Sequence, residues 1–215
     1  MTQKLLIFDL DGTIADTIES IREAVNLTME RYGYPTRSYD EIRLAIGNGA
    51  RELIRKSLPE KKRDDEAHVS EVYGLYDQTY GLTYDHVDGC YPGVRESIFA
   101  LITAGNTVAV LSNKQDLYTK KIVDLLFPEK PFAFVQGQTE LPRKPDPTVP
   151  LMIMEQLSFS PKDTFFIGDS DVDMQTAHNA GMTAVGCAWG YRGEDALREA
   201  GADVLLLNGS DLASL

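Results

Sequence analysis

Residues 5–13 read LLIFDLDGT, a short apolar run followed at once by two acidic residues and a glycine. An apolar run closed by polar residues is typical of a buried strand. Polar side chains directly after such a strand lie at the carboxyl edge of a parallel sheet, where ligands bind in α/β folds. Alternation along an extended chain puts Asp9 and Asp11 on the same side. The stretch therefore predicts two carboxylates at one edge of a sheet.

Similar apolar runs recur along the chain and alternate with helical patterns. The runs, most of them rich in Val, Ile or Phe, fall at residues 108–111, 132–135, 165–167, 184–187 and 204–207. Between them, helical periodicity appears at residues 117–127, 149–157, 172–180 and 194–200. Strands and helices in this order predict an α/β fold with a doubly wound parallel sheet.

One connection is much longer than the others. About ninety residues separate the first apolar run from the second, whereas a parallel crossover needs only about a dozen. The intervening sequence has helical periodicity at residues 18–29, 42–58 and 65–80. We therefore expect a core domain of residues 1–14 and 90–215, with a smaller helical cap domain, residues 15–89, inserted after the first strand.

Composition limits the classes of partner. The chain of 215 residues carries a formal net charge of −12, and it lacks the clustered Lys and Arg that binding to nucleic acid needs. The apolar run at residues 5–8 is too brief for a signal-peptide core, and no later run approaches membrane-spanning length. Cys90 and Cys187 stand alone, without disulfide or zinc spacing. We expect a cytoplasmic monomer or homodimer with no nucleic-acid or membrane partner.

The first acidic motif has the residue types of a covalent catalyst. A carboxylate is ionised at neutral pH, so Asp9 needs no base to act as a nucleophile. Asp11 is suited to protonate a leaving oxygen and then to activate water, since a neighbouring carboxylate raises one pKa of the pair. Gly12 permits a turn whose amide groups cradle phosphate. The alternative is an ordinary Asp-Gly turn, with Thr13 or Asp16 capping the next helix.

The second acidic motif, GDSDVD at residues 168–173, follows another apolar run. Asp169 leaves its strand at the same sheet edge as Asp9, and carboxylates gathered there repel one another unless a cation is present. Hard oxygen ligands, with room for water and phosphate, favour Mg²⁺. Asp173 stands four residues after Asp169, on the same helical face, and either supports the metal or caps the helix.

Two further segments offer groups for binding phosphate. Ser112 and Asn113 follow the run at residues 108–111 and carry a hydroxyl and an amide that donate hydrogen bonds. Lys144 lies among prolines that stiffen the backbone. It supplies the positive charge that an anionic nucleophile needs when it attacks a phosphate. Taken singly, these residues are also typical of a turn and of a solvated lysine.

These motifs, in this order and over essentially the whole chain, resemble those of the haloacid dehalogenase superfamily of phosphatases. The resemblance implies that Asp9 forms an aspartyl-phosphate, that Asp11 is the general acid and base, and that Lys144 is catalytic. It implies Mg²⁺ as cofactor and a small phosphorylated metabolite as substrate, with the cap closing over it. The implied phosphate-binding residues are Leu10, Asp11, Ser112, Asn113 and Lys144. The implied metal site consists of Asp9, the main-chain carbonyl of Asp11, Asp169 and, in support, Asp173.

Within the superfamily the chain is most similar to the phosphoglycolate phosphatase group, through IGNGA at residues 46–50, KPDP at 144–147 and WGY at 189–191. The expected function is hydrolysis of a phosphoglycolate-like phosphomonoester. Gly49 and Arg51 are the candidates for substrate recognition, although an arginine in the first turn of a helix is just as often solvated. The alternatives are a hexose-phosphate mutase or a pyrophosphatase with the same core residues, and a non-catalytic ligand-binding protein.

Overall fold

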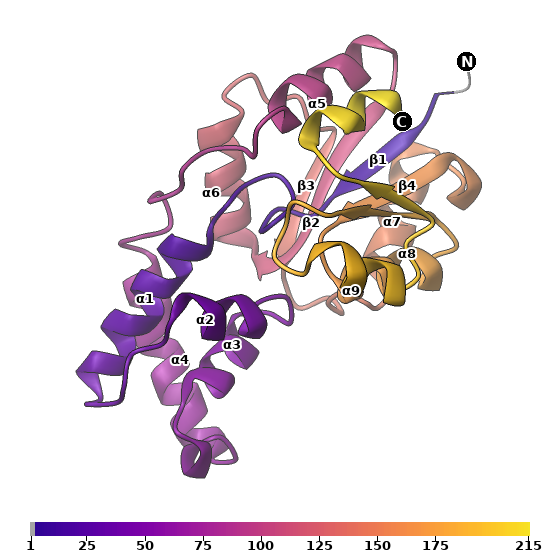
Figure 1. Cartoon of the computed structure of the whole chain (residues 1–215). Helices are drawn as coiled ribbons and strands as arrows, with labels where there is room; N and C mark the ends of the chain where they lie inside the picture. Colours follow the sequence, from indigo (N-terminus) through magenta and orange to yellow (C-terminus); the bar gives the residue numbers. More distant parts are fainter. Residues whose placement is uncertain (1–2) are drawn as a thin grey trace. The chain divides into compact units, whose positions relative to one another are not determined.

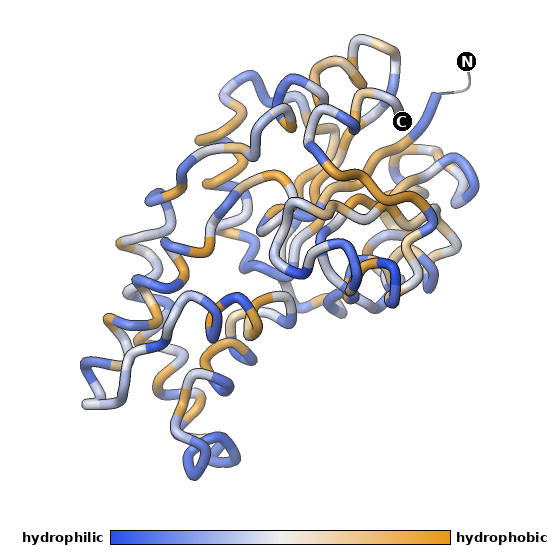
Figure 2. The backbone as a smooth tube through the Cα atoms, viewed as in Figure 1, coloured by the Kyte–Doolittle hydropathy of each residue, from blue (hydrophilic) through white to orange (hydrophobic). Residues whose placement is uncertain are grey.

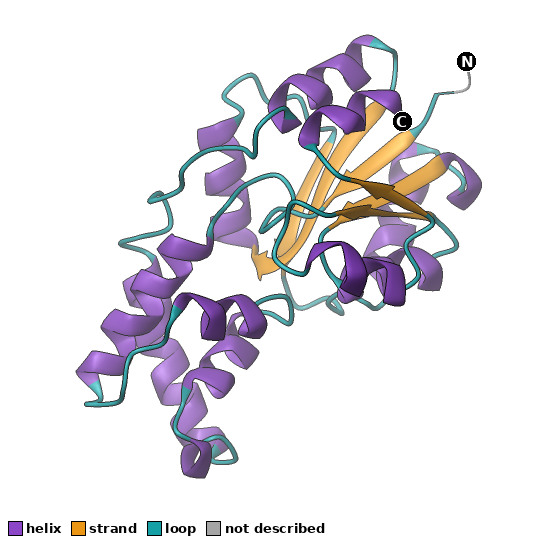
Figure 3. Cartoon of the chain, viewed as in Figure 1, coloured by secondary structure: helices purple, strands orange, loops and turns teal. Residues whose placement is uncertain are grey.

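The structure, a computed structural model that describes residues 3–215, contains a parallel sheet built around the first apolar run. Its strands are β1 (Leu5–Phe8), β2 (Thr107–Gln115), β3 (Phe134–Gln138), β4 (Thr164–Gly168), β5 (Thr183–Cys187) and β6 (Val204–Leu206). Within the described residues they pair in the order β3-β2-β1-β4-β5-β6, and the pairings are parallel (Figure 1, Figure 3). The predicted α/β fold with a doubly wound parallel sheet is confirmed.

Strand β1 lies between β2 and β4, and its residues are fully buried. Figure 2 shows this part of the backbone as apolar. Phe8 lies opposite Val110 on one side and Ile167 on the other. The Asp9 N–H extends the ladder by donating to the Ile167 carbonyl at 2.8 Å. The strand order reverses beside β1, which is where ligands bind in such sheets, so the backbone of Asp9 is fixed at the switch point.

Helices cover both faces of the sheet (Figure 1). On one face lie α5 (Val94–Thr103), α6 (Asp116–Leu126) and the C-terminal turn η3 (Gly209–Ser214); on the other lie α7 (Thr148–Leu157), α8 (Asp171–Asn179) and α9 (Gly193–Glu199). The second face buries apolar side chains such as Ile7, Ile153 and Met174 in one cluster. Removing such side chains from water contributes roughly 1.5–3 kcal/mol each. None of the helices of residues 3–215 combines the length and apolar character that crossing a bilayer requires.

The long connection after β1 is helical, as predicted. It carries α1 (Ile18–Arg31), α2 (Tyr39–Ala45), α3 (Ala50–Ser57), the short turn η1 (Glu60–Lys62) and α4 (Glu66–Tyr80). The chain divides into two compact units: one is formed by the described residues up to Asp16 with Gly89–Leu215, and the other is Thr17–Asp88. The two connecting segments meet within the first unit, where the Tyr91 N–H donates to the Ile14 carbonyl at 2.9 Å.

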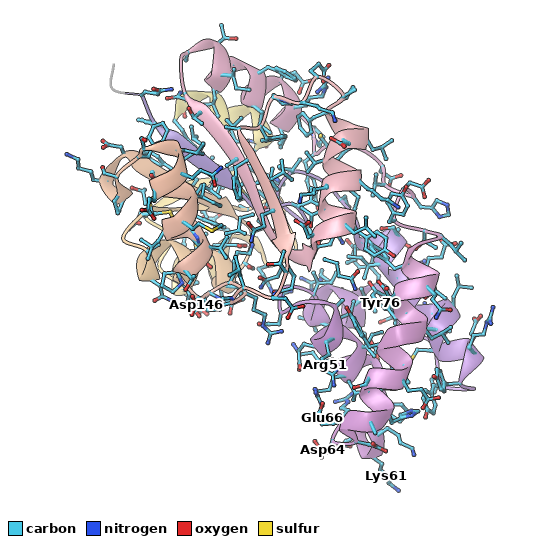
Figure 4. The ribbon with its side chains drawn as sticks, turned by 180° about the vertical axis from the view of Figure 1, so that it is seen from behind. Arg51, Lys61, Asp64, Glu66, Tyr76 and Asp146 are labelled. Atoms are coloured by element: carbon cyan, nitrogen blue, oxygen red, sulfur yellow. The ribbon has the colours of Figure 1, made fainter. Side chains whose placement is uncertain are left out.

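Helices α1 and α4 pack together at the centre of the inserted unit. Each buries apolar residues at helical spacing, among them Val25 on α1 and Tyr76 on α4, and Figure 4 shows Tyr76 on its helix. The hydroxyls of Thr28 and Thr79 meet between the helices at 2.8 Å. Each hydroxyl also reaches a carbonyl of its own helix, Thr28 that of Ala24 at 2.7 Å and Thr79 that of Tyr76 at 2.9 Å, so both buried groups have partners.

The helical stretch expected at residues 42–58 is two helices rather than one. Helix α2 ends at Ala45 and α3 begins at Ala50. Between them, Gly47 and Gly49 have φ values of 113° and 82°, which residues with side chains rarely adopt. An α-helix cannot continue through such conformations, so the two glycines separate the helices.

Three core elements differ from the expected pattern. Helix α5 was not predicted; it begins directly after Gly93, whose φ is 79°. Strand β2 continues to Gln115 instead of ending at residue 111, and its register with β3 shifts after Leu111. Such a shift marks a bulge or a similar irregularity in the pairing, past which the strand continues. Strand β3 begins at Phe134 instead of residue 132.

Candidate active site

Three acidic side chains converge at the carboxyl edge of the sheet. Asp9 follows β1, Asp169 follows β4, and Asp173 lies in the first turn of α8. One carboxylate oxygen from each lies within 4.8 Å of the other two, and all three residues are buried. Because β1 and β4 are neighbours in the sheet, their ends bring the two acidic motifs together.

Lys144 joins this group as a buried cation. Its Nζ lies 2.9 Å from Asp9 Oδ1 and 2.7 Å from Asp173 Oδ1, and its side chain is only 3% exposed. Burial alone lowers the pKa of Lys144, but the attraction of Asp173 and Asp9 outweighs burial and raises that pKa above its ordinary value. Lys144 is therefore charged at neutral pH and links the two acidic motifs.

The Asp9 carboxylate is buried but incompletely hydrogen-bonded. Asp9 Oδ1 meets the Lys144 ammonium at 2.9 Å, and no other donor among residues 3–215 forms a hydrogen bond with this oxygen. Burial raises the pKa of Asp9 to about 6; Lys144 opposes this rise, while Asp173 and Asp11 add to it. At pH 7 the group is still mostly ionised. An ionised oxygen with spare acceptor capacity is suited to bind a metal or to attack an electrophile.

Asp169 is held in one orientation by its surroundings. The Tyr191 N–H donates to its Oδ2 at 2.7 Å, and the Thr13 hydroxyl donates to its Oδ1 at 3.3 Å. Gly12 has a φ of 82°, and a Cβ there would lie 2.4 Å from Asp169 Oδ2. A Cβ at Gly190 would lie 2.2 Å from the Asp169 Cβ. These two glycines therefore let the backbone approach the carboxylate more closely than other residues allow.

Asp173 both caps α8 and belongs to the acidic group. The N–H and hydroxyl of Ser170 donate to its Oδ2 at 3.1 and 2.6 Å, in a capping box. Its Oδ1 accepts from Lys144. The capping interpretation offered by the sequence is confirmed, and support of a metal by Asp173 stays a prediction. The expected helical spacing is wrong, since α8 begins at Asp171 and Asp169 precedes it; the turn through Ser170 brings the two carboxylates together.

Asn113 holds the backbone of Lys144. Its Nδ2 donates to the Lys144 carbonyl at 3.0 Å, and its Oδ1 accepts from the Lys144 N–H at 2.9 Å. Both residues are buried, so the amide satisfies two main-chain groups that water does not reach. Ser112 is also buried, and its Oγ accepts from the Lys114 N–H at 3.3 Å. Ser112 and Asn113 lie inside β2, not after it.

Asp11 lies beside the three-carboxylate group and pairs with Lys114, which is not among the predicted site residues. Lys114 Nζ is 3.1 Å from Asp11 Oδ1, and the two side chains are 7% and 11% exposed. Lys114 was overlooked because the strand was expected to end at residue 111. The register shift between Leu111 and Gln115 also breaks strict alternation of the side chains, so periodicity gave no signal for Lys114.

The charges of this site fit a divalent cation. Four carboxylates accompany two ammonium groups and leave a formal charge of −2 on the set Asp9, Asp11, Asp169, Asp173, Lys114 and Lys144. Burial raises the pKa of Asp169 well above its ordinary value, and Asp173 and Asp9 add to the effect. An added positive charge would relieve this repulsion. The donor atoms are hard oxygens, which suit ions such as Mg²⁺, Mn²⁺ or Ca²⁺.

The two cap candidates lie in the inserted unit. Gly49 precedes α3. Arg51, on α3, donates from Nη2 to Glu66 at 2.9 Å and to the Ser70 hydroxyl at 2.8 Å, and Figure 4 shows Arg51 and Glu66 close together. The Arg51 side chain is 43% exposed. It therefore links α3 to α4 and still reaches solvent.

Comparisons with known proteins agree with this geometry. A profile of the family described as haloacid dehalogenase-like hydrolase matches residues 6–187. A phosphoglycolate phosphatase of Pseudomonas putida is 31% identical over 192 residues, which cover 87% of this chain and 70% of that one. A phosphoglycolate phosphatase of Psychrobacter arcticus is 33% identical over 202 residues, which cover 91% of this chain and 88% of that one. The crystal structure of a predicted phosphoglycolate phosphatase from Haemophilus somnus superposes with a TM-score of 0.91 at 26% identity, covering 100% and 98% of the two chains.

Proposed function

This chain belongs to the haloacid dehalogenase-like hydrolases, and on that premise we propose that it hydrolyses a small phosphomonoester resembling phosphoglycolate, through an aspartyl-phosphate on Asp9. The observation that carries the proposal is the buried Asp9 carboxylate, with Lys144 at 2.9 Å and the Asp169 and Asp173 oxygens within 4.8 Å. A binding protein would have no need of so many buried charges held close together. An enzyme needs it to stabilise a transferring phosphoryl group.

We propose Mg²⁺ as the cofactor, held by Asp9, Asp169 and the main-chain carbonyl of Asp11, with Asp173 in support. When bound, Mg²⁺ supplies positive charge that offsets the charge of the nucleophile and of the phosphate oxygens. Carboxyl groups outnumber ammonium groups at this site, so a divalent ion would offset the excess of negative charge. The fixed orientation of Asp169 supports its place in the set.

The chemical steps use residues of the sheet edge. An oxygen of Asp9 attacks phosphorus and forms the phosphoenzyme as the substrate's P–O bond breaks, while Asp11 gives a proton to the leaving oxygen. Asp11 then takes a proton from the water that attacks the phosphoenzyme, which releases phosphate and restores both carboxyl groups. Lys144 neutralises charge at the phosphoryl oxygens throughout.

The remaining core residues bind phosphate. Ser112 donates its hydroxyl, and the turn after Leu10 and Asp11 offers main-chain groups. That turn is tight, because the Leu10 carbonyl accepts from the Ile14 N–H at 3.0 Å. Asn113 contributes by fixing Lys144, whose main-chain groups it holds. The unit Thr17–Asp88 acts as the cap, and its Gly49 and Arg51 contact the part of the substrate that is not phosphate.

A phosphate-release screen tests this function. Wild type is assayed with and without Mg²⁺ on phosphoglycolate, sugar phosphates, nucleotides and pyrophosphate, beside Asp9→Asn and, as a matched control, Asp171→Asn. Asp171 is an exposed first-turn residue of the same acidic motif as Asp169. We expect Mg²⁺-dependent release that is largest for a small phosphomonoester. Asp9→Asn should lose at least about a thousandfold in kcat, as removal of a nucleophile does, while Asp171→Asn stays active.

Two outcomes would contradict the proposal. Asp9→Asn with wild-type turnover would exclude Asp9 as the nucleophile, and wild type that released no phosphate from any compound would favour a binding protein. Incubation with a bisphosphorylated hexose separates hydrolysis from phosphoryl transfer back to the substrate. Free phosphate is the expected product, whereas an isomerised sugar phosphate would identify a mutase.

A further inference from the structure

The strand that carries Ser112 continues past its bulge and brings a second lysine to the site. Lys114 Nζ lies 3.1 Å from Asp11 Oδ1, and the side chains are 7% and 11% exposed. The other lysine of the site, Lys144, pairs with Asp9 and Asp173 instead. Lys114 therefore pairs with the candidate general acid, Asp11, and Lys144 pairs with the candidate nucleophile, Asp9.

The backbone of Lys114 is well fixed. Its N–H donates to Ser112 Oγ at 3.3 Å, and the Thr119 hydroxyl donates to its carbonyl at 3.2 Å. Gly137 on β3 allows this approach, because a Cβ there would lie 2.4 Å from the Lys114 carbonyl oxygen. A long side chain on a fixed backbone, mostly removed from water, places its ammonium with little freedom to move.

Asp11 stands on the turn after β1, and one oxygen of its carboxylate faces Lys114. A general acid is effective only when its proton-bearing oxygen lies within hydrogen-bond reach of the leaving atom. Engaging one oxygen of a carboxyl group with a fixed cation defines where the other oxygen points. Charge-assisted contacts of this kind are shorter and more directional than those between neutral groups.

We propose that Lys114 is a positioning residue that orients the Asp11 carboxyl group for proton transfer to the leaving oxygen. The inference rests on the proposed function of Asp11 as the general acid. Lys114 acts through Asp11, and its effect should therefore depend on how much the leaving group needs a proton. An alkoxide leaving group needs one, whereas a nitrophenolate leaves without it.

The test compares kcat/KM for an alkyl ester, phosphoglycolate, with that for an aryl ester, p-nitrophenyl phosphate. The quantity kcat/KM reports the steps up to phosphoenzyme formation, so the later hydrolysis of the intermediate does not affect it. The variants are Lys114→Met, Lys114→Gln, Lys114→Arg and Asp11→Asn. The matched control is Lys120→Met, which removes an exposed lysine paired with Asp116 at 2.7 Å.

We expect Lys114→Met and Lys114→Gln to lower kcat/KM by about tenfold to a hundredfold on the alkyl ester and by less than about threefold on the aryl ester. The loss on the alkyl ester is a part of the whole contribution that a general acid makes. Lys114→Arg should recover most of the alkyl activity, and Lys120→Met should match wild type on both. Lys114→Gln keeps a polar end in the pocket and is measured in case the methionine variant does not fold.

Asp11→Asn separates the two levels of the argument. If Asp11→Asn loses kcat/KM equally on both esters, the proposed role of Asp11 is wrong. If Asp11→Asn loses more on the alkyl ester and the Lys114 variants do not, Lys114 does not position Asp11. Equal losses on both esters in the Lys114 variants would also overturn the inference, because they would indicate a structural or phosphate-binding role.

Discussion

Two clusters of ion pairs, one in each compact unit, use the same chemistry in opposite surroundings. In the core, Lys144 and Asp173 pair at 2.7 Å with side chains that are 3% and 0% exposed. In the inserted unit, Arg51 and Glu66 pair at 2.9 Å with side chains that are 43% and 63% exposed. Desolvation makes a buried charge costly unless it is paired, whereas water screens an exposed pair until it contributes little. Burial, and not the pairing itself, distinguishes the proposed catalytic cluster from the structural one.

The largest effect should appear when the buried cluster loses its cation. Lys144→Met leaves buried carboxylates without their ammonium partner, which should cost about 3–5 kcal/mol of unfolding free energy. It should also lower kcat by about a hundredfold or more, because the phosphoryl oxygens lose a positive charge. Urea unfolding with EDTA present measures the first quantity, and phosphate release in Mg²⁺ the second.

Lys120→Met supplies the matched control, since Lys120 is 53% exposed in its pair with Asp116. Its unfolding free energy should stay close to that of wild type. The contrast between buried and exposed ion pairs breaks if the Lys144 and Lys120 variants unfold at the same urea concentration.

A smaller effect should follow from removing the amide that holds Lys144. Asn113→Ala leaves the buried N–H and carbonyl of Lys144 without the partners at 2.9 and 3.0 Å. Losing such partners costs about 1–3 kcal/mol. A displaced ammonium should lower kcat/KM by about tenfold to a hundredfold, as small misplacements of catalytic groups do. If kcat/KM falls while stability does not, the Asn113 amide acts on the substrate directly.

The amino-acid sequence was sufficient for features that depend on local pattern. The apolar runs predict the sheet. Because the residue after a buried strand lies at the edge of the sheet, the positions of Asp9 after β1 and Asp169 after β4 predict that both carboxylates lie there. The separation between β1 and β2 predicts an insertion. Each of these depends only on which residues are apolar and on how far apart the runs lie.

Features that depend on register and on distant partners were not predictable in the same way. The Lys114 position required knowing that β2 continues through a bulge, and periodicity does not reveal bulges. The contact of Asn113 with Lys144 joins a strand to a remote proline-rich segment. Tyr191 contributes a main-chain N–H to Asp169, and a backbone donor leaves no mark on the side-chain pattern. Tertiary contacts alone determine these three features.

Glu66→Gln should have the smallest effect on the free energy of unfolding, and it tests the exposed cluster most directly. Hydrogen bonds from Arg51 and then Arg55 lower the pKa of Glu66 below its ordinary value of 4.5. The folded protein then binds fewer protons at this group than the unfolded chain does, so stability rises with pH between the two pKa values. The contribution of Glu66 to stability is therefore complete above about pH 4.5 and is lost as the pH falls through the lowered folded pKa.

The difference in unfolding free energy between wild type and Glu66→Gln should be smaller than that for Asn113→Ala, should shrink in high salt, and should vanish toward acid. A difference that persisted in high salt and at low pH would mean that Glu66 is held by packing and not by charge, and the contrast between the two clusters would no longer rest on solvent screening.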